Sequence, residues 1–249
     1  LSAMLRPKDR PWFKFTTQVD KIDNDAEASQ FLEYLTDTLR SRLYDPRTNF
    51  IAATKQGDHD FVCFGQPVIS VEEAPNRDHL FLRCHHLRDC AWLENDIGQI
   101  DHLHRKDEMT ARAMKRRFGE KKLHESITRA CQDEPGKPFS LRVIVMPADE
   151  YDYIGSDSKS SLKGKATKST KLPFVCIYID VANCKVIKEA GLPDFIYAVP
   201  RWHTISGSQY AFSPAAMTSL PDARMAQQLA RILLEAGEKA VDPPLIARE

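Results

Sequence analysis

The sequence lacks an excess of charge of either sign. Its 249 residues carry 35 Lys and Arg against 35 Asp and Glu, so the formal net charge is zero. A protein that coats nucleic acid usually has a basic surplus, because contacts to phosphate provide most of its affinity. The balance therefore argues against a nucleic-acid coat protein.

Long apolar runs and dense cysteine are also missing. No stretch of about eighteen apolar residues occurs that could span a membrane, so no membrane partner is expected. Residues 6–10 are all charged or proline, unlike a secretory signal. Six cysteines are too few for a disulfide-stapled domain of this length, which favours reduced thiols. Because the chain starts at Leu1 rather than Met and stops shortly after Pro243 and Pro244, we expect a fragment.

The composition that is present, 42% hydrophobic and 28% charged, is typical of a folded protein. Apolar positions at helical spacing predict an amphipathic helix over 26–43, and a weaker helix over 47–57. Two short basic helices are expected at 110–118 and 121–131. Runs of β-branched and aromatic residues predict strands at 11–15, 60–71, 79–87, 141–146, 174–181, 185–187 and 195–199. The predicted fold class is α+β.

The last part of the chain predicts a long helix. Ser213 followed by Pro214 is typical of a helix start, and residues 219–222 repeat that signal. The helix over 220–241 would be about 33 Å long. Its apolar residues form one stripe: Met225, Leu229, Ile232, Leu233, Ala236 and Ala240. Such a stripe suits either an ordinary helix bundle or lateral packing against copies of itself in a ring.

Searches for catalytic chemistry find little. One cluster holds the residue types that bind metals: Cys84, His85, His86, Cys90, His102 and His104. Zinc sites use two paired knuckles, and here the cysteine spacing of six has no matching second pair, which favours a strand cysteine and solvent-facing histidines. Lys165 follows a glycine but lacks the rest of a phosphate-binding loop. Ser206 and Ser208 do not form a nucleophile elbow. We therefore expect no catalytic residue, no cofactor and no enzyme.

Two basic regions stand out from the neutral total. One comprises the short helices, with Arg112, Lys115 and Arg116. The other is a serine- and glycine-rich stretch that we interpret as a mobile loop, with Lys163, Lys165 and Lys168. Either could contact phosphate, but a solvated face or a contact with another subunit is favoured.

The order of motifs near the end of the chain resembles the portal, or head-to-tail connector, family of short-tailed bacteriophages. The motifs are Pro-Arg-Trp at 200–202, Gly-Ser-Gln-Tyr at 207–210, Ser-Pro at 213–214, Leu-Pro-Asp-Ala at 220–223 and Pro-Pro-Leu at 243–245. Shorter matches cover nearly the whole chain. Ala211 and Phe212 depart from the Gly-Arg that is usual in the family, which affects only that turn.

The resemblance implies a fold and a role. It implies a mixed α/β wing domain at 1–212, a stem helix at 213–242 and the start of a clip at 243–249. The protein would form a dodecameric ring at one capsid vertex, the conduit for packaging and ejection of double-stranded DNA and the head-to-tail attachment site. Implied partners are the terminase large subunit, a head-tail adaptor, and the major capsid and scaffolding proteins. The location would be the virion, after assembly in the host cytoplasm.

Two hypotheses follow from these observations. The first is the structural portal, in which Arg224, Gln228 and Arg231, which lie off the apolar stripe, are expected among tunnel or intersubunit contacts. Zero net charge suits a conduit, because strong pairing with phosphate would stall moving DNA. The second is a metal-binding, nucleic-acid-processing enzyme or module that uses the cluster between Cys84 and His104.

Overall fold

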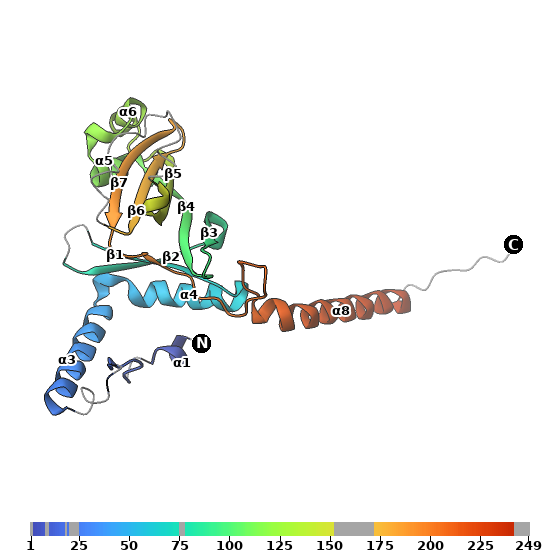
Figure 1. Ribbon diagram of the computed structural model, residues 1–249. Helices are drawn as coiled ribbons and strands as arrows, with labels where there is room; N and C mark the ends of the chain where they lie inside the picture. Colours follow the sequence, from blue (N-terminus) through green and yellow to red (C-terminus); the bar gives the residue numbers. More distant parts are fainter. Residues whose placement is uncertain are drawn as a thin grey trace.

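The computed structural model describes residues 2–7, 10–17, 19, 25–74, 78–151 and 172–241. Two antiparallel sheets form its body, with helices packed around them, and helix α8 (Leu220–Val241) extends away from that body (Figure 1). The fold is therefore α+β, as predicted. Within the described residues, no helix is both long and apolar enough to cross a membrane.

Helices α1 (Ser2–Leu5), α3 (Ala26–Leu43) and α4 (Phe50–Phe64) precede the sheets. The predicted bounds of α3 are confirmed, because its signals are local: the Asp25 side chain accepts a hydrogen bond from the N–H of Ala28 at 3.2 Å. The 3-10 helix η1 (Pro46–Thr48) then turns the chain into α4.

The predicted end of the second helix at Gly57 is wrong. Helix α4 continues to Phe64 and takes the first part of the strand predicted over 60–71. A Cβ atom at Gly57 would lie only 2.8 Å from Ile69 Cδ1. The glycine therefore lets the helix lie close to the sheet and does not stop it.

The strand predicted over 11–15 is also wrong. The ring of Trp12 stacks on that of Phe50, with centroids 6.3 Å apart, and the N–H of Phe15 donates to Thr36 Oγ1 at 3.1 Å. The aromatic residues of this segment thus pack on helices α3 and α4, and their alternation does not reflect sheet pairing.

The smaller sheet has the order β2-β1-β8, with all pairs antiparallel. Its strands are β1 (Val68–Glu73), β2 (Leu80–His85) and β8 (Tyr197–Ala198). Helix α4 lies against it, where Phe50 and Ala53 pack with Leu82 in a small apolar core. This arrangement leaves β2 at one edge of the sheet.

The larger sheet has the order β3-β4-β5-β6-β7, again antiparallel throughout. Its strands are β3 (Cys90–Glu94), β4 (Ile100–Thr110), β5 (Pro138–Pro147), β6 (Phe174–Asp180) and β7 (Lys185–Leu192). The 3-10 helix η2 (Leu87–Asp89) leads into β3. Fully buried Leu103 and Val143 pack in the main core, which lies against the two short helices.

These helices are α5 (Ala111–Phe118) and α6 (Glu125–Asp133), joined by the 3-10 helix η3 (Glu120–Lys122). Their existence confirms the sequence prediction, although α6 begins four residues later than predicted. Helix α5 inserts buried Met114 into the main core, and helix α6 inserts buried Ile127. Their remaining faces carry the basic residues outward.

Helix α8 follows a π-helical turn, η5 (Ala215–Ser219). Buried Ser213 starts this segment, since its Oγ accepts a hydrogen bond from the N–H of Ala216 at 2.9 Å. The bounds of α8 agree with the predicted helix over 220–241. The boundaries proposed for a wing, stem and clip stay predictions, and residues 243–249 lie outside the described part of the chain.

Replacing Gly65 with alanine is expected to lower the free energy of unfolding by roughly 3 kcal/mol. Gly65 ends α4 with φ at +84°, and an added Cβ would lie 2.7 Å from the carbonyl carbon of Phe212. Gly98 is the matched control, because its φ is +80° but nothing lies within 4 Å of its Cβ position, so its alanine variant should lose about 1 kcal/mol. Urea unfolding measures both, and equal losses would contradict the role of the close approach.

Candidate functional site

Helix α8 presents an apolar stripe that nothing in the described structure covers. All of its residues are exposed, and Leu229, Ile232 and Leu233 remain 56%, 59% and 72% accessible. A contiguous exposed apolar face of this kind marks a surface for association with another molecule. The three polar residues predicted to make tunnel or intersubunit contacts lie on the same exposed helix.

Two of these polar residues, Arg224 and Gln228, make no side-chain hydrogen bond or ion pair with another described residue. The third, Arg231, donates from Nε to Glu235 Oε1 at 2.7 Å, one turn along the helix. The structure thus places all three on the surface and leaves their predicted role as a prediction.

The segment that joins the body to α8 is fixed by aromatic and charged contacts. Arg201 pairs with Glu94, and the Trp202 ring lies against that of Phe61, with centroids 5.0 Å apart. The Tyr210 ring lies 4.9 Å from that of Trp92. The Pro-Arg-Trp and Gly-Ser-Gln-Tyr motifs therefore attach the base of α8 to β3 of the larger sheet and to helix α4.

The basic helix pair keeps only part of its charge at the surface. Arg112 and Arg116 are exposed, and Lys115 pairs with Glu120 at 2.9 Å. Arg117 donates to the Tyr178 hydroxyl at 3.0 Å and pairs with Glu72 at 3.3 Å, while 35% of its side chain stays accessible. Lys163, Lys165 and Lys168, predicted as a second basic contact surface, lie outside the described residues.

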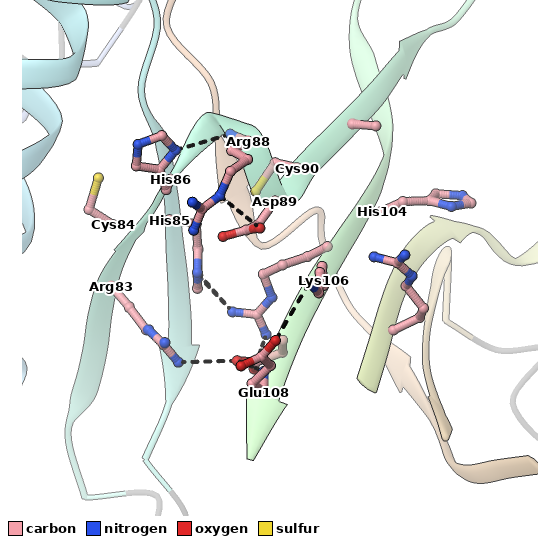
Figure 2. Close-up of a pocket in the computed structure, with 14 residues that line it drawn as sticks. Arg83, Cys84, His85, His86, Arg88, Asp89, Cys90, His104, Lys106 and Glu108 are labelled. Atoms are coloured by element: carbon pink, nitrogen blue, oxygen red, sulfur yellow. Dashed lines mark hydrogen bonds and ion pairs between the residues drawn. The ribbon is translucent and has the colours of Figure 1, made fainter. Parts of the chain in front are cut away.

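The residues of the suspected metal cluster do not converge. On β2, Cys84 lies on the face towards α4 and contacts Asp60 Oδ2 at 3.9 Å, whereas His85 points towards β4 (Figure 2). His86 accepts the N–H of Arg88 at 3.1 Å. Burial raises the pKa of the Cys84 thiol to about 11, so it stays protonated and is a poor metal ligand.

Cys90 lies in the main core, and His102 is engaged elsewhere. Burial lowers the pKa of His104. Burial raises the pKa of the Cys90 thiol to about 12. His102 lies between Asp101 and Glu150, with nitrogen to oxygen distances of 2.6 and 2.7 Å. Among the residues that the structure describes, no three His, Cys, Asp or Glu side chains are arranged to hold a metal ion. The metal-dependent alternative therefore has no geometric support.

A buried polar network joins the two sheets, and sequence reasoning missed it. Arg105 on β4 has a side chain only 3% accessible and donates from Nη1 to His85 Nε2 on β2 at 2.7 Å. Asp107 Oδ2 lies 3.6 Å from Arg105 Nη2, and the Tyr197 ring centroid 5.9 Å from Arg105 Cζ. Ser70 Oγ is a further partner of His85, at 2.9 Å. The sequence signal that could have indicated this network is the alternation of charged residues along β4, which places Arg105 and Asp107 on one face of the strand.

Acid is expected to weaken this network through His85. Burial, reinforced by the cationic Arg105 and Arg83, lowers the pKa of His85 to about 3, against about 6.5 when unfolded. Between these values only the unfolded chain binds the proton, so the stability is complete above pH 6.5 and falls as the pH decreases towards 3. Urea unfolding measures this effect. Between pH 7 and pH 5, the free energy of unfolding should fall by about 2 kcal/mol less in His85→Gln than in the unaltered protein.

His102→Gln is the control of opposite sign. Burial opposes protonation of His102, but hydrogen bonds to Asp101 and Glu150 outweigh it and raise its pKa. This histidine therefore adds stability below its unfolded pKa that is lost as the pH rises. The His102→Gln variant should therefore lose stability more steeply in acid. An unchanged pH dependence in His85→Gln would contradict the assignment of the acid sensitivity to His85.

Comparisons with known proteins agree with the sequence motifs. The family model described as "Bacteriophage head to tail connecting protein" matches residues 1–249. A relative described as a "Probable portal protein", from Bordetella phage BPP-1, is 24% identical over 250 residues. The match covers 98% of this chain and 42% of the relative, so the chain spans less than half of that protein's length. Because the family model matches from the first residue to the last, the chain belongs to the bacteriophage head to tail connecting protein family.

Proposed function

We propose that this chain is part of a structural portal subunit that forms a ring at one capsid vertex, through which double-stranded DNA is packaged and ejected. The exposed apolar stripe of α8 carries the proposal, because a helix that extends from the body has no other described surface on which to bury that face. Family membership and the name of the relative support the portal role. The protein acts by enclosing DNA and attaching the head to the tail, without catalysis of its own.

The proposed ring is a dodecamer, with the wing at 1–212, the stem helix at 213–242 and the start of the clip at 243–249. In this arrangement the α8 helices of neighbouring copies pack side by side, and the stripe of each is buried at the contact. The proposed partners are the terminase large subunit, a head-tail adaptor, and the major capsid and scaffolding proteins. Assembly takes place in the host cytoplasm, and the finished ring resides in the virion.

The mass of the assembled particle tests the ring directly. Native mass spectrometry of the purified full-length protein should show one species at twelve times the subunit mass. A full-length protein that stays a stable monomer at micromolar concentration would refute the proposal. Metal analysis of the same sample addresses the alternative, since one stoichiometric zinc per chain would favour a metal-binding module.

Charge reversal on the polar side of α8 is expected to impair assembly or packaging. Arg224→Glu replaces an exposed cation with an anion. Arg231→Glu does the same and also places a like charge one turn from Glu235, with which Arg231 now forms an ion pair. Ring formation is measured by electron microscopy, and packaged DNA by resistance to nuclease. Normal rings and normal packaging in both variants would remove these residues from the contact surface.

A further inference from the structure

A cleft of about 1010 Å³ opens between the two sheets, beside strand β4 (Figure 2). Its walls come from β2, from η2 and the start of β3, from β4, and from one residue of β5. Five Arg or Lys residues line it against three Asp or Glu. The cleft is thus basic in a neutral chain, and few apolar side chains line it, which disfavours a small hydrophobic ligand.

One wall of the cleft is an unpaired strand edge. Strand β3 begins at Cys90, opposite Arg105, so it leaves residues 106–110 of β4 without a neighbour on that side. Strand β5 pairs with these residues on the other side. The N–H of Glu108 donates to its neighbour Asp107 Oδ1 at 3.1 Å, which places the backbone groups of Glu108 and Lys106 on the open side.

The side chains around this edge favour a carboxylate. Lys106 and Arg142 are directly opposite each other on β4 and β5, an arrangement of like charges that destabilises a sheet. Lys106 has Glu108 at 3.5 Å, but Arg142 has no carboxylate partner among the described residues. On the other face of β4, Arg83 and Arg105 both pair with Asp107, at 3.9 and 3.6 Å, and Arg105 has a further carboxylate, Glu72, at 4.0 Å.

Buried Arg105 contributes an unused donor to the same site. Its Nε has no hydrogen-bond partner in the described structure, although only 3% of the side chain is accessible to solvent. Such a donor is normally paired in a folded protein. An incoming carboxylate is a partner that its charge favours.

We propose that the free edge of β4 binds an extended acidic segment of a partner protein, which adds a strand to the larger sheet. Main-chain hydrogen bonds to residues 106–110 hold the segment, and its glutamate or aspartate side chains pair with the basic residues of the cleft. A nucleic acid fits less well, because single strands bind by stacking on aromatic rings and no Phe, Tyr or Trp lines the cleft. The apolar stripe of α8 takes no part in this contact.

Fluorescence anisotropy with a labelled peptide that alternates threonine and glutamate tests the proposal. The full-length protein should bind this peptide. Lys106→Glu and Arg142→Glu should each weaken the binding at least about tenfold, since each converts an attraction into a repulsion. Lys188→Glu changes another exposed cation, on β7 at the far edge of the sheet; it is the matched control and should leave the binding unchanged.

Two further probes of the unaltered protein separate the alternatives. A threonine–glutamate peptide in which every backbone nitrogen is methylated keeps the charge but removes all of the N–H donors, so it should bind at least about tenfold more weakly. Equal binding of the two peptides would overturn strand addition, and no binding of the first would overturn the site. Tighter binding of an oligothymidylate than of the acidic peptide would assign the cleft to nucleic acid instead.

Discussion

Replacing Arg105 with methionine is expected to lower the free energy of unfolding by about 3 kcal/mol, although methionine fills most of the same volume. The loss comes from the partners that remain. Asp107 would stay buried with only Arg83 near it, at 3.9 Å, and His85 would lose the donor at 2.7 Å. Removing one member of a buried charged network leaves the others desolvated and unpaired, which costs more than the network contributes in net stability.

Lys106→Met is the matched control for this experiment. It also replaces a cation with methionine, at the next residue of the same strand. Lys106, however, is exposed, and its ion pair with Glu108 is a surface contact. Its loss should be below about 0.5 kcal/mol. Urea unfolding of the two variants gives the comparison, and similar losses would show that the network does not join the sheets.

Replacing Leu229 with glutamate is expected to prevent formation of the proposed ring while leaving the fold of each subunit intact. Leu229 is 56% exposed, so the described body loses no packing. At a contact between neighbouring α8 helices, however, the change removes about 2 kcal/mol of apolar burial and adds the desolvation of a charge. The affinity between subunits should fall by at least roughly thirtyfold. Analytical ultracentrifugation of the full-length protein should then show monomers.

Gln227→Glu serves as the control for the stripe. It introduces the same charge two residues earlier, on the opposite side of α8, since successive residues turn by about 100°. This variant should assemble as the unaltered protein does. If Leu229→Glu also assembled normally, the stripe would not be the contact between subunits.

Local signals allowed the helices to be predicted. The apolar spacing of α3 and α8 lies within the helices themselves, and Asp25 caps α3 from the residue before it, so their bounds follow from the sequence. The end of α4 does not, because the role of Gly57 depends on its contact with Ile69 on a distant strand. The alternation in residues 11–15 failed for the same reason, since it reflects packing on helices that follow later in the chain.

The site residues were harder to predict, because their partners are remote in sequence. Arg105 reads as a surface cation until β2 places His85 against it. Arg117 lies on the basic helix α5, and its hydrogen bond to Tyr178 depends on a strand far away in the sequence. The cysteine spacing already disfavoured a metal site, but the expectation of solvent-facing histidines was wrong for His85 and His102, which distant residues bury.

The π-helical turn at the base of α8 determines the direction in which the helix presents its stripe. In η5 the N–H groups bond one residue further back than in an α-helix, which accommodates one extra residue in the turn. Deleting a single residue there would rotate everything beyond it by about 100° around the helix axis without altering a side chain of α8. In the proposed ring, the direction in which each stripe faces its neighbour is therefore determined by the five residues of η5, which lie outside the stripe.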